Sequence, residues 1–124
     1  MKKQTPLSIG VLIIVFLSVI AIASFFYFHD VKDDNCKKMK EDLRLYVENK
    51  NFCNDVSECQ IVQLIDCDFG LAGDEIDRDH IEEVFSEFYS PEGECWTGEI
   101  PECEDPKKGK IIACKNNKCV FEAQ

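Results

Sequence analysis

The sequence has no pair of cysteines separated by two residues, and it has only two histidines, His29 and His80. The missing Cys-x-x-Cys spacing removes the usual signature of thiol–disulfide oxidoreductases and zinc ribbons. Neither histidine has a serine or cysteine partner at a recognisable spacing, and the acidic neighbours Glu82 and Glu83 point apart on a predicted helix. We therefore predict no catalytic residue, no metal ligand set and no cofactor, and we expect a protein that is not an enzyme.

Charge is missing from the 22-residue run Leu7–Phe28. At about 1.5 Å per residue, a helix of this length reaches about 33 Å, enough to cross a bilayer core of about 30 Å. Lys2 and Lys3 precede the run and acidic residues follow it. Because basic residues prefer the cytoplasmic side, we expect 1–29 to be a cytoplasmic stub with a transmembrane signal-anchor, and 30–124 to be an extracytoplasmic, cysteine-rich domain.

The same run has a second interpretation as a cleaved signal peptide. Leu7–Ile20 would be its h-region and Ala21–Ala23 an Ala-x-Ala cleavage site. Cleavage there leaves the apolar Ser24–Phe28 exposed at the new end of the chain, so we favour the retained anchor. The alternative is a secreted, inhibitor- or toxin-like disulfide domain.

Basic residues are in the minority outside the membrane run. All 24 acidic residues but only 12 of the 14 basic residues lie in 30–124, which gives that part a net charge of −12. An acidic surface repels nucleic acid and anionic lipid, so we expect no nucleic-acid partner. The partners that remain are the membrane, through Leu7–Phe28, and an unknown protein outside the cytoplasm.

All eight cysteines lie after the apolar run. This density is typical of small exported domains, whose cores are too small for stability without disulfides. We expect every cysteine to be paired, although the pairing does not follow from the sequence. The set is Cys36, Cys53, Cys59, Cys67, Cys95, Cys103, Cys114 and Cys119.

Apolar periodicity predicts two helices in this domain. After a polar spacer, His29–Asn35, the first helix covers Cys36–Asn51, with Asp34 or Asn35 as its cap. The second covers Asp79–Ser90, with Asp79 as its cap and Glu82 completing a near capping box. Its buried stripe is Ile81, Val84, Phe85 and Phe88, and its outward side chains are Glu82, Glu83 and Glu87.

The remaining segments predict strands and loops. Cys59–Cys67 is short and β-branched, as in a strand, Asp68–Gly73 is a turn region, and Pro91–Gly109 is a loop. Lys110–Phe121 predicts a hairpin that turns at Asn116-Asn117. The expected fold is α+β: one N-terminal transmembrane helix, then a small disulfide-rich domain of two helices and a short antiparallel sheet.

The hairpin places Cys114 opposite Cys119, and Ile112 on the same face as Phe121. A disulfide between Cys114 and Cys119 is the pairing that local geometry most allows. The alternative is that each reaches a helix or the first strand across the core, which closes a longer loop and, in the entropic description, stabilises more.

Two further segments have a possible binding role. The acidic stretch Asp66, Asp68, Asp74, Glu75, Asp77 and Asp79 offers oxygen ligands for calcium, but its spacing does not fit an EF-hand, and a solvated loop with a helix cap explains it better. The candidate binding loop lies between Cys95 and Cys103 and comprises Trp96, Thr97, Gly98, Glu99, Ile100 and Pro101. Tethering lowers the entropy lost on binding, and tryptophan is enriched at hot spots. The alternative for Trp96 is a lid over the small core.

Three blocks of sequence carry a resemblance. They are Phe52–Val62 with Cys53 and Cys59, Cys67–Gly70, and Cys114–Val120. In this order they resemble the small exported domains of bacteria and archaea called eight-cysteine-cluster proteins. The resemblance implies an exported α+β disulfide domain and no activity. In that family a second cysteine often follows the Cys-x-x-Gly block, where this chain has Leu71, so the pairing stays open.

Overall fold

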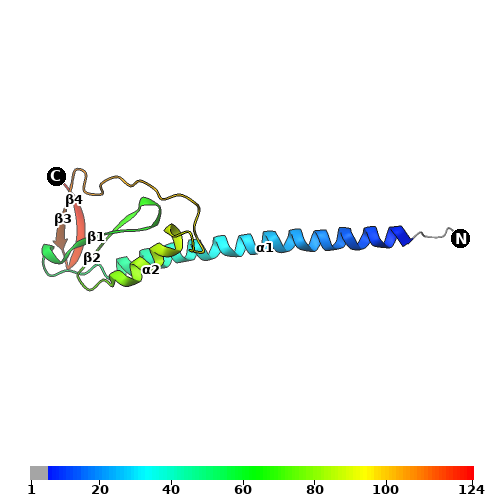
Figure 1. Ribbon diagram of the computed structural model, residues 1–124. Coiled ribbons are helices and arrows are strands. Elements are labelled where there is room, and N and C mark those ends of the chain that lie inside the picture. Colours follow the sequence, from blue (N-terminus) through cyan, green and yellow to red (C-terminus); the bar gives the residue numbers. More distant parts are fainter. Residues whose placement is uncertain (1–5) are drawn as a thin grey trace. The chain divides into compact units, whose positions relative to one another are not determined.

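The computed structural model describes residues 6–124 (Figure 1). These residues belong to two compact units, one that ends at Asp34 and one that begins at Asn35. We describe each unit by itself. Lys2 and Lys3, on which the predicted membrane orientation rests, lie outside the described residues.

The first helix, α1, covers Pro6–Asn49 and belongs to both units (Figure 1). In the first unit its side chains from Ile9 to Phe28 are exposed all around the helix. The one hydrogen bond of Ser18 in this run goes to the carbonyl oxygen of Ile14 at 2.8 Å, so the hydroxyl is satisfied within the helix. Among the described helices, α1 alone is long and apolar enough to cross a membrane.

The predicted break between the apolar helix and the helix Cys36–Asn51 is wrong. The expected spacer His29–Asn35 is helical, and the expected helix Cys36–Asn51 is the last part of α1. Neither Asp34 nor Asn35 is therefore a helix cap. The physical reason is that no glycine or proline stands between Gly10 and Asn49, so no residue in this interval interrupts the backbone ladder.

A first hairpin follows α1. After the short 3-10 turn η1 (Val56–Glu58), strand β1 (Gln60–Gln63) pairs antiparallel with β2 (Phe69–Ala72). The predicted strand Cys59–Cys67 is thus shorter, and its last part is the 3-10 turn η2 (Ile65–Cys67). The expected turn region Asp68–Gly73 is instead largely β2.

Close packing against α1 explains why residue 70, within the predicted turn region Asp68–Gly73, is a glycine. A Cβ atom on Gly70 would lie 2.7 Å from Cγ1 of Val47 on α1, closer than real Cβ contacts. The approach of the helix therefore explains why this strand position has a glycine, and the chain reverses earlier. There the backbone φ of both Asp66 and Cys67 is positive, and the amide of Leu64 donates to the carbonyl oxygen of Asp68 at 2.7 Å.

The second helix, α2, covers Arg78–Tyr89. Its cap is Asp77 and not Asp79, because the Asp77 carboxylate accepts hydrogen bonds from the amides of Asp79 and His80, at 3.0 and 3.4 Å. The predicted near capping box between Asp79 and Glu82 is therefore wrong, because the cap lies two residues before Asp79. The predicted stripe is confirmed: Ile81 and Phe88 are buried and Val84 and Phe85 half-buried, all in contact with the core, while Glu82 and Glu83 are exposed and Glu87 is half-buried.

The main core lies between the last turns of α1, the first hairpin and α2. Its buried side chains are Leu43, Val47, Val62, Leu64, Ile65, Ala72, Ile76, Ile81, Phe88 and Cys95. At about 1.5–3 kcal/mol for each large apolar side chain removed from water, this burial is the main favourable term. A smaller cluster of Cys53, Leu71 and Cys119 connects the first hairpin with the second.

The second hairpin confirms the prediction for Lys110–Phe121. Strand β3 (Lys110–Lys115) pairs with β4 (Lys118–Ala123), and the two turn residues Asn116 and Asn117 have positive φ. Asparagine tolerates this conformation, which two-residue hairpins need. Cys114 stands opposite Cys119, and Ile112 opposite Phe121 on the face that meets the smaller cluster.

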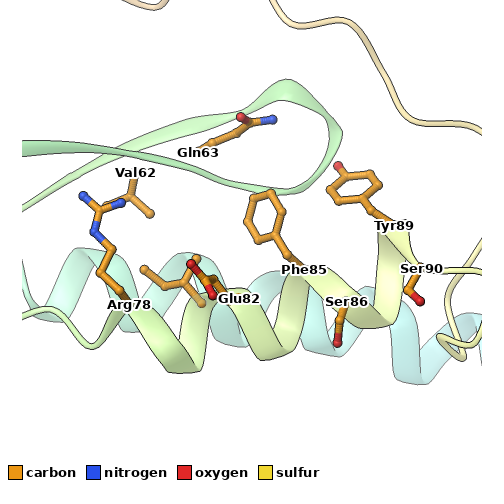
Figure 2. A pocket seen from close by; sticks show the side chains of 9 residues that line it. Val62, Gln63, Arg78, Glu82, Phe85, Ser86, Tyr89 and Ser90 are labelled. Atoms are coloured by element: carbon orange, nitrogen blue, oxygen red, sulfur yellow. The ribbon is translucent and has the colours of Figure 1, made fainter.

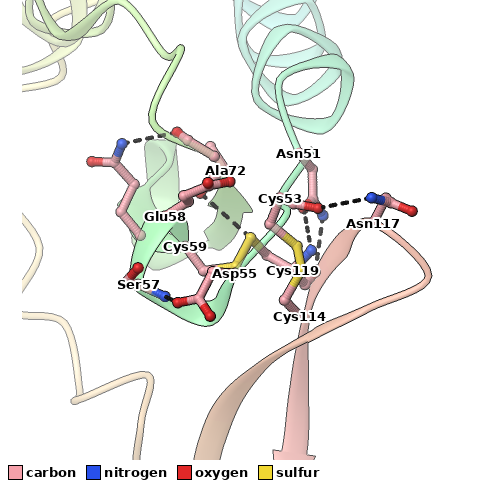
Figure 3. Close-up of a disulfide and its surroundings, with 12 residues drawn as sticks. Asn51, Cys53, Asp55, Ser57, Glu58, Cys59, Ala72, Cys114, Asn117 and Cys119 are labelled. Carbon is pink, nitrogen blue, oxygen red and sulfur yellow. Dashed lines mark hydrogen bonds between the residues drawn. A yellow bond between two sulfur atoms is a disulfide. The ribbon is translucent and has the colours of Figure 1, made fainter.

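Four disulfides use all eight cysteines, as expected, and none is free. The pairs are Cys36–Cys95, Cys53–Cys114, Cys59–Cys119 and Cys67–Cys103. The predicted Cys114–Cys119 bond is therefore wrong. Both cysteines bond outside the hairpin, as in the alternative, but their partners lie in the segment between α1 and β1 and not in a helix or strand (Figure 3). These bonds close longer chain loops than a bond within the hairpin would.

Candidate functional site

The candidate binding loop is held at both ends by disulfides, but its two cysteines do not pair with each other. Cys95 is bonded to Cys36 of α1, and Cys103 to Cys67 in the turn of the first hairpin. Both anchor points belong to the same compact unit. The loop is therefore fixed to two separate parts of the core structure.

Between its anchors the loop offers its side chains to solvent. Residues 97–102 are all exposed, and Ile100 is 68% exposed. In the described chain, no backbone–backbone hydrogen bond involves residues 97–104. The loop thus presents an apolar side chain, two acidic ones and backbone groups to solvent.

Trp96 occupies the start of this loop and is half-buried. Its amide donates to the carbonyl oxygen of Gly93 at 3.3 Å, which closes a tight turn after α2. Its side chain is not among those that pack against either core cluster. The exposed part of the predicted contact surface is therefore centred on Ile100 and not on Trp96.

The acidic stretch is dispersed over the fold. Asp66 forms an ion pair with Lys40 of α1, and Asp77 caps α2. Asp68, Asp74, Glu75 and Asp79 are exposed. His80, next to this stretch, makes an edge contact with Tyr46 at 4.8 Å between ring centroids, and the Tyr46 hydroxyl accepts from the amide of Asp77 at 3.0 Å. These contacts hold α2 on α1.

In residues 6–124, one group of potential ligand atoms is close enough to surround a metal ion. It consists of the sulfur atoms of Cys53, Cys59 and Cys119, which lie within 4.8 Å of one another. All three belong to disulfides, so they have no thiolate to offer (Figure 3). This group is a structural link between the two hairpins.

Hydrogen bonds shift the pKa of three exposed groups. The side chain of Arg44 donates to Glu41 at 2.6 and 3.0 Å, which lowers the pKa of Glu41 and raises the pKa of Arg44. The pKa of Asp55 is lowered because its carboxylate accepts from the amide of Ser57 at 2.9 Å. None of these groups belongs to the candidate binding loop.

The structure has a groove between β1 and α2 that the sequence alone did not predict. It has a volume of about 410 Å³, and its lining is mostly apolar, with Phe85 and Tyr89 rising from α2 toward the hairpin (Figure 2). Phe85 was assigned to the core stripe, and the structure leaves it half-buried at the groove. The signal available in the sequence was the four-residue spacing of these two aromatic residues beside exposed Glu82 and Ser86.

No protein-family model, no curated protein and no solved structure matches this chain. The features of this chain that bear on its function are therefore the tethered loop, the groove and the apolar helix.

Proposed function

We propose that this protein is a membrane-anchored, extracytoplasmic binding module whose contact loop covers residues 97–102. The observation that carries the proposal is the combination of two disulfide anchors with six exposed residues that lack backbone pairing. An anchored loop loses less conformational entropy on binding than a free one, so more of its contact energy becomes affinity.

The apolar part of α1 supports the anchor. Its side chains are exposed from Ile9 to Phe28. The run ends in four consecutive aromatic residues, Phe25–Phe28, and one of them is Tyr27, a residue type that is enriched at the membrane–water interface. An apolar surface of this size is unfavourable in water, and a membrane would cover it.

The disulfides support the extracytoplasmic location. Bonds of this kind persist in oxidising compartments and are rare in the cytosol. The resemblance to exported eight-cysteine-cluster domains agrees with this location and stays a proposal. A protease added to intact cells should remove a tag placed after Gln124, whereas protection of the tag until lysis would contradict this orientation.

The loop is tested with a photoreactive amino acid at one of two isoleucines. Ile100 lies in the loop, and Ile111 is an exposed isoleucine of β3 that serves as the matched control. Irradiation of membranes that contain the full chain should link the probe at Ile100, but not at Ile111, to a protein outside the cytoplasm. Equal labelling from both positions would argue against the loop as the contact surface.

The secreted inhibitor- or toxin-like domain is the alternative to the anchored module. Signal cleavage after Ala23 would give a soluble product that begins at Ser24. Cell fractionation with N-terminal sequencing distinguishes the two, because the anchored protein stays full-length in the membrane fraction.

A further inference from the structure

The first hairpin has one edge without a partner strand. In the antiparallel β1–β2 pair, the amide of Leu64 donates to the carbonyl oxygen of Asp68, so alternation along the ladder turns the backbone groups of Ile61 and Gln63 away from β2. In the part of the chain that the structure describes, no backbone–backbone hydrogen bond outside the ladder uses these groups. They offer two donors and two acceptors to an incoming strand.

The two sides of the hairpin are not equivalent. On the β2 side, the amide after the strand, that of Gly73, donates to the carbonyl oxygen of Lys50 at 2.8 Å. On the β1 side lies the groove of about 410 Å³, which is lined by Val62 and Gln63 and by α2 (Figure 2). An added strand beside β1 would therefore extend the sheet over the flank of α2.

This edge lacks the devices that normally block strand addition. The strand reads Gln-Ile-Val-Gln, with neither charge nor proline. The floor beside it is apolar, because the rings of Phe85 and Tyr89 lie 5.4 Å apart between centroids and are only half-buried. Side chains alternate along a strand, so every second residue of an added strand would lie on this floor.

The charged residues near the groove indicate which kind of partner can bind there. Exposed Glu82 lies in the groove. On the opposite face of the hairpin, the side-chain nitrogen of Gln63 lies 3.3 Å from the Sγ atom of Cys103. The residues on either side of Cys103 in the sequence are Glu102 and Glu104, which are both exposed. The one basic side chain that lines the groove, Arg78, donates to the Gln60 side chain. A second copy would bring another domain of net charge −12, which disfavours self-association.

We propose that the free edge of β1 binds an extended basic peptide segment of a partner protein, with alternating apolar and basic side chains, by strand addition. The apolar side chains cover Phe85 and Tyr89, and the basic ones meet the acidic residues of the opposite face. Backbone pairing supplies much of the affinity and the alternation supplies the specificity. The site shares Glu102 with the contact loop, but the strand pairing itself uses the backbone of β1, so the proposal does not depend on the proposed function.

The probe is a synthetic peptide of seven alternating lysine and valine residues, acetylated and amidated at its ends. With the full chain in detergent micelles, nuclear magnetic resonance should show binding and slower hydrogen exchange at the amides of Ile61 and Gln63. A peptide with glutamate in place of lysine should bind at least about tenfold more weakly, a difference of about 1.4 kcal/mol. Absence of binding up to about 1 mM, or equal binding of both peptides, would overturn the proposal.

Two further comparisons isolate the backbone bonds. Gln63→Pro removes the outward amide, whereas the matched variant Gln63→Ala loses the same side chain and keeps that amide. Proline should weaken peptide binding about tenfold relative to alanine. The backbone amides of the peptide can be methylated at all lysines or at all valines. Only one of these two changes should abolish binding, because only every second residue of an added strand turns its backbone amide toward β1. Equal effects in either comparison, with four disulfides intact, would refute strand addition.

Discussion

Cys114 and Cys119 stand directly opposite each other across β3 and β4, yet each is bonded to a cysteine outside the hairpin. Their partners, Cys53 and Cys59, flank the short η1 turn between α1 and β1. Two neighbouring disulfides thus fasten the second hairpin to the segment that connects the helix with the first hairpin (Figure 3). Side-chain hydrogen bonds reinforce this junction, because Asn51 donates to and accepts from the backbone of Cys119, at 3.0 and 2.8 Å.

Removal of both outer partners should redirect this pair. In the double variant Cys53→Ser, Cys59→Ser, we expect Cys114 to bond with Cys119. Beside a two-residue turn they form a pair without mutual hydrogen bonds, whose Cα atoms are about 4.5 Å apart, within the range of about 4.4–6.8 Å that disulfides need. Peptide mapping by mass spectrometry checks the bond, and two free thiols in the folded variant would contradict it.

The disulfide between Cys36 and Cys95 should carry a large part of the stability. It closes a loop with a sequence separation of 59 residues and holds the end of α2 on α1. In the chain-entropy description, the double variant Cys36→Ser, Cys95→Ser should lose about 4 kcal/mol of unfolding free energy. Denaturant unfolding of the full chain in detergent measures the loss. Reduction of the unmodified protein should lower its melting temperature further, and equal melting with and without reductant would refute a structural role.

Gly73 should not tolerate a side chain. A Cβ atom there would lie 2.0 Å from the carbonyl oxygen of Phe52, and the Gly73 amide already donates to Lys50. The clash is with backbone and cannot be relieved by a rotamer change, so Gly73→Ala should cost at least about 2 kcal/mol. The neighbouring exposed change Asp74→Ala should stay within about 0.5 kcal/mol. Equal stabilities of the two variants would show that the segment at Phe52 yields.

Asp55 should make stability depend on pH in the acidic range. Its carboxylate caps η1, and the hydrogen bond from the Ser57 amide lowers its pKa in the folded state. This contribution is present above the ordinary aspartate value of about 3.9 and is lost as the pH falls through the lower folded-state pKa. The stability advantage over Asp55→Asn should therefore shrink below about pH 4. Unfolding curves at several pH values measure it, and an advantage that stays constant across this range would contradict the prediction.

Trp96 should contribute less stability than a core aromatic residue. It is half-buried and does not pack on either core cluster. Trp96→Ala should thus cost less than the about 3–5 kcal/mol typical of a well-buried aromatic. A loss in that range, or a blue-shifted and quencher-resistant indole emission, would support the lid interpretation instead.

Local patterns in the sequence determined the elements whose signals lie within a few residues. The hairpin at Asn116-Asn117 followed from residues that accept positive φ, and the α2 stripe followed from the spacing of Ile81, Val84, Phe85 and Phe88. The apolar run Leu7–Phe28 predicted a helix from its length and its lack of charge. In the hairpin and in α2, the turn chemistry and the period of the side chains specify the backbone without help from distant residues.

Only the tertiary structure decided what depends on residues far apart in the chain. The register made a Cys114–Cys119 bond possible, but packing of the hairpin against the segment before β1 brings Cys53 and Cys59 into bonding distance. Gly70 lies in a strand and not in the predicted turn region, and the approach of Val47 leaves little room for a side chain there. The groove beside β1 likewise exists because α2, held by the Cys36–Cys95 bond, leaves Phe85 and Tyr89 half-covered. A sequence pattern records which face of an element is apolar, whereas the distance between two elements is set by the packing of the whole core.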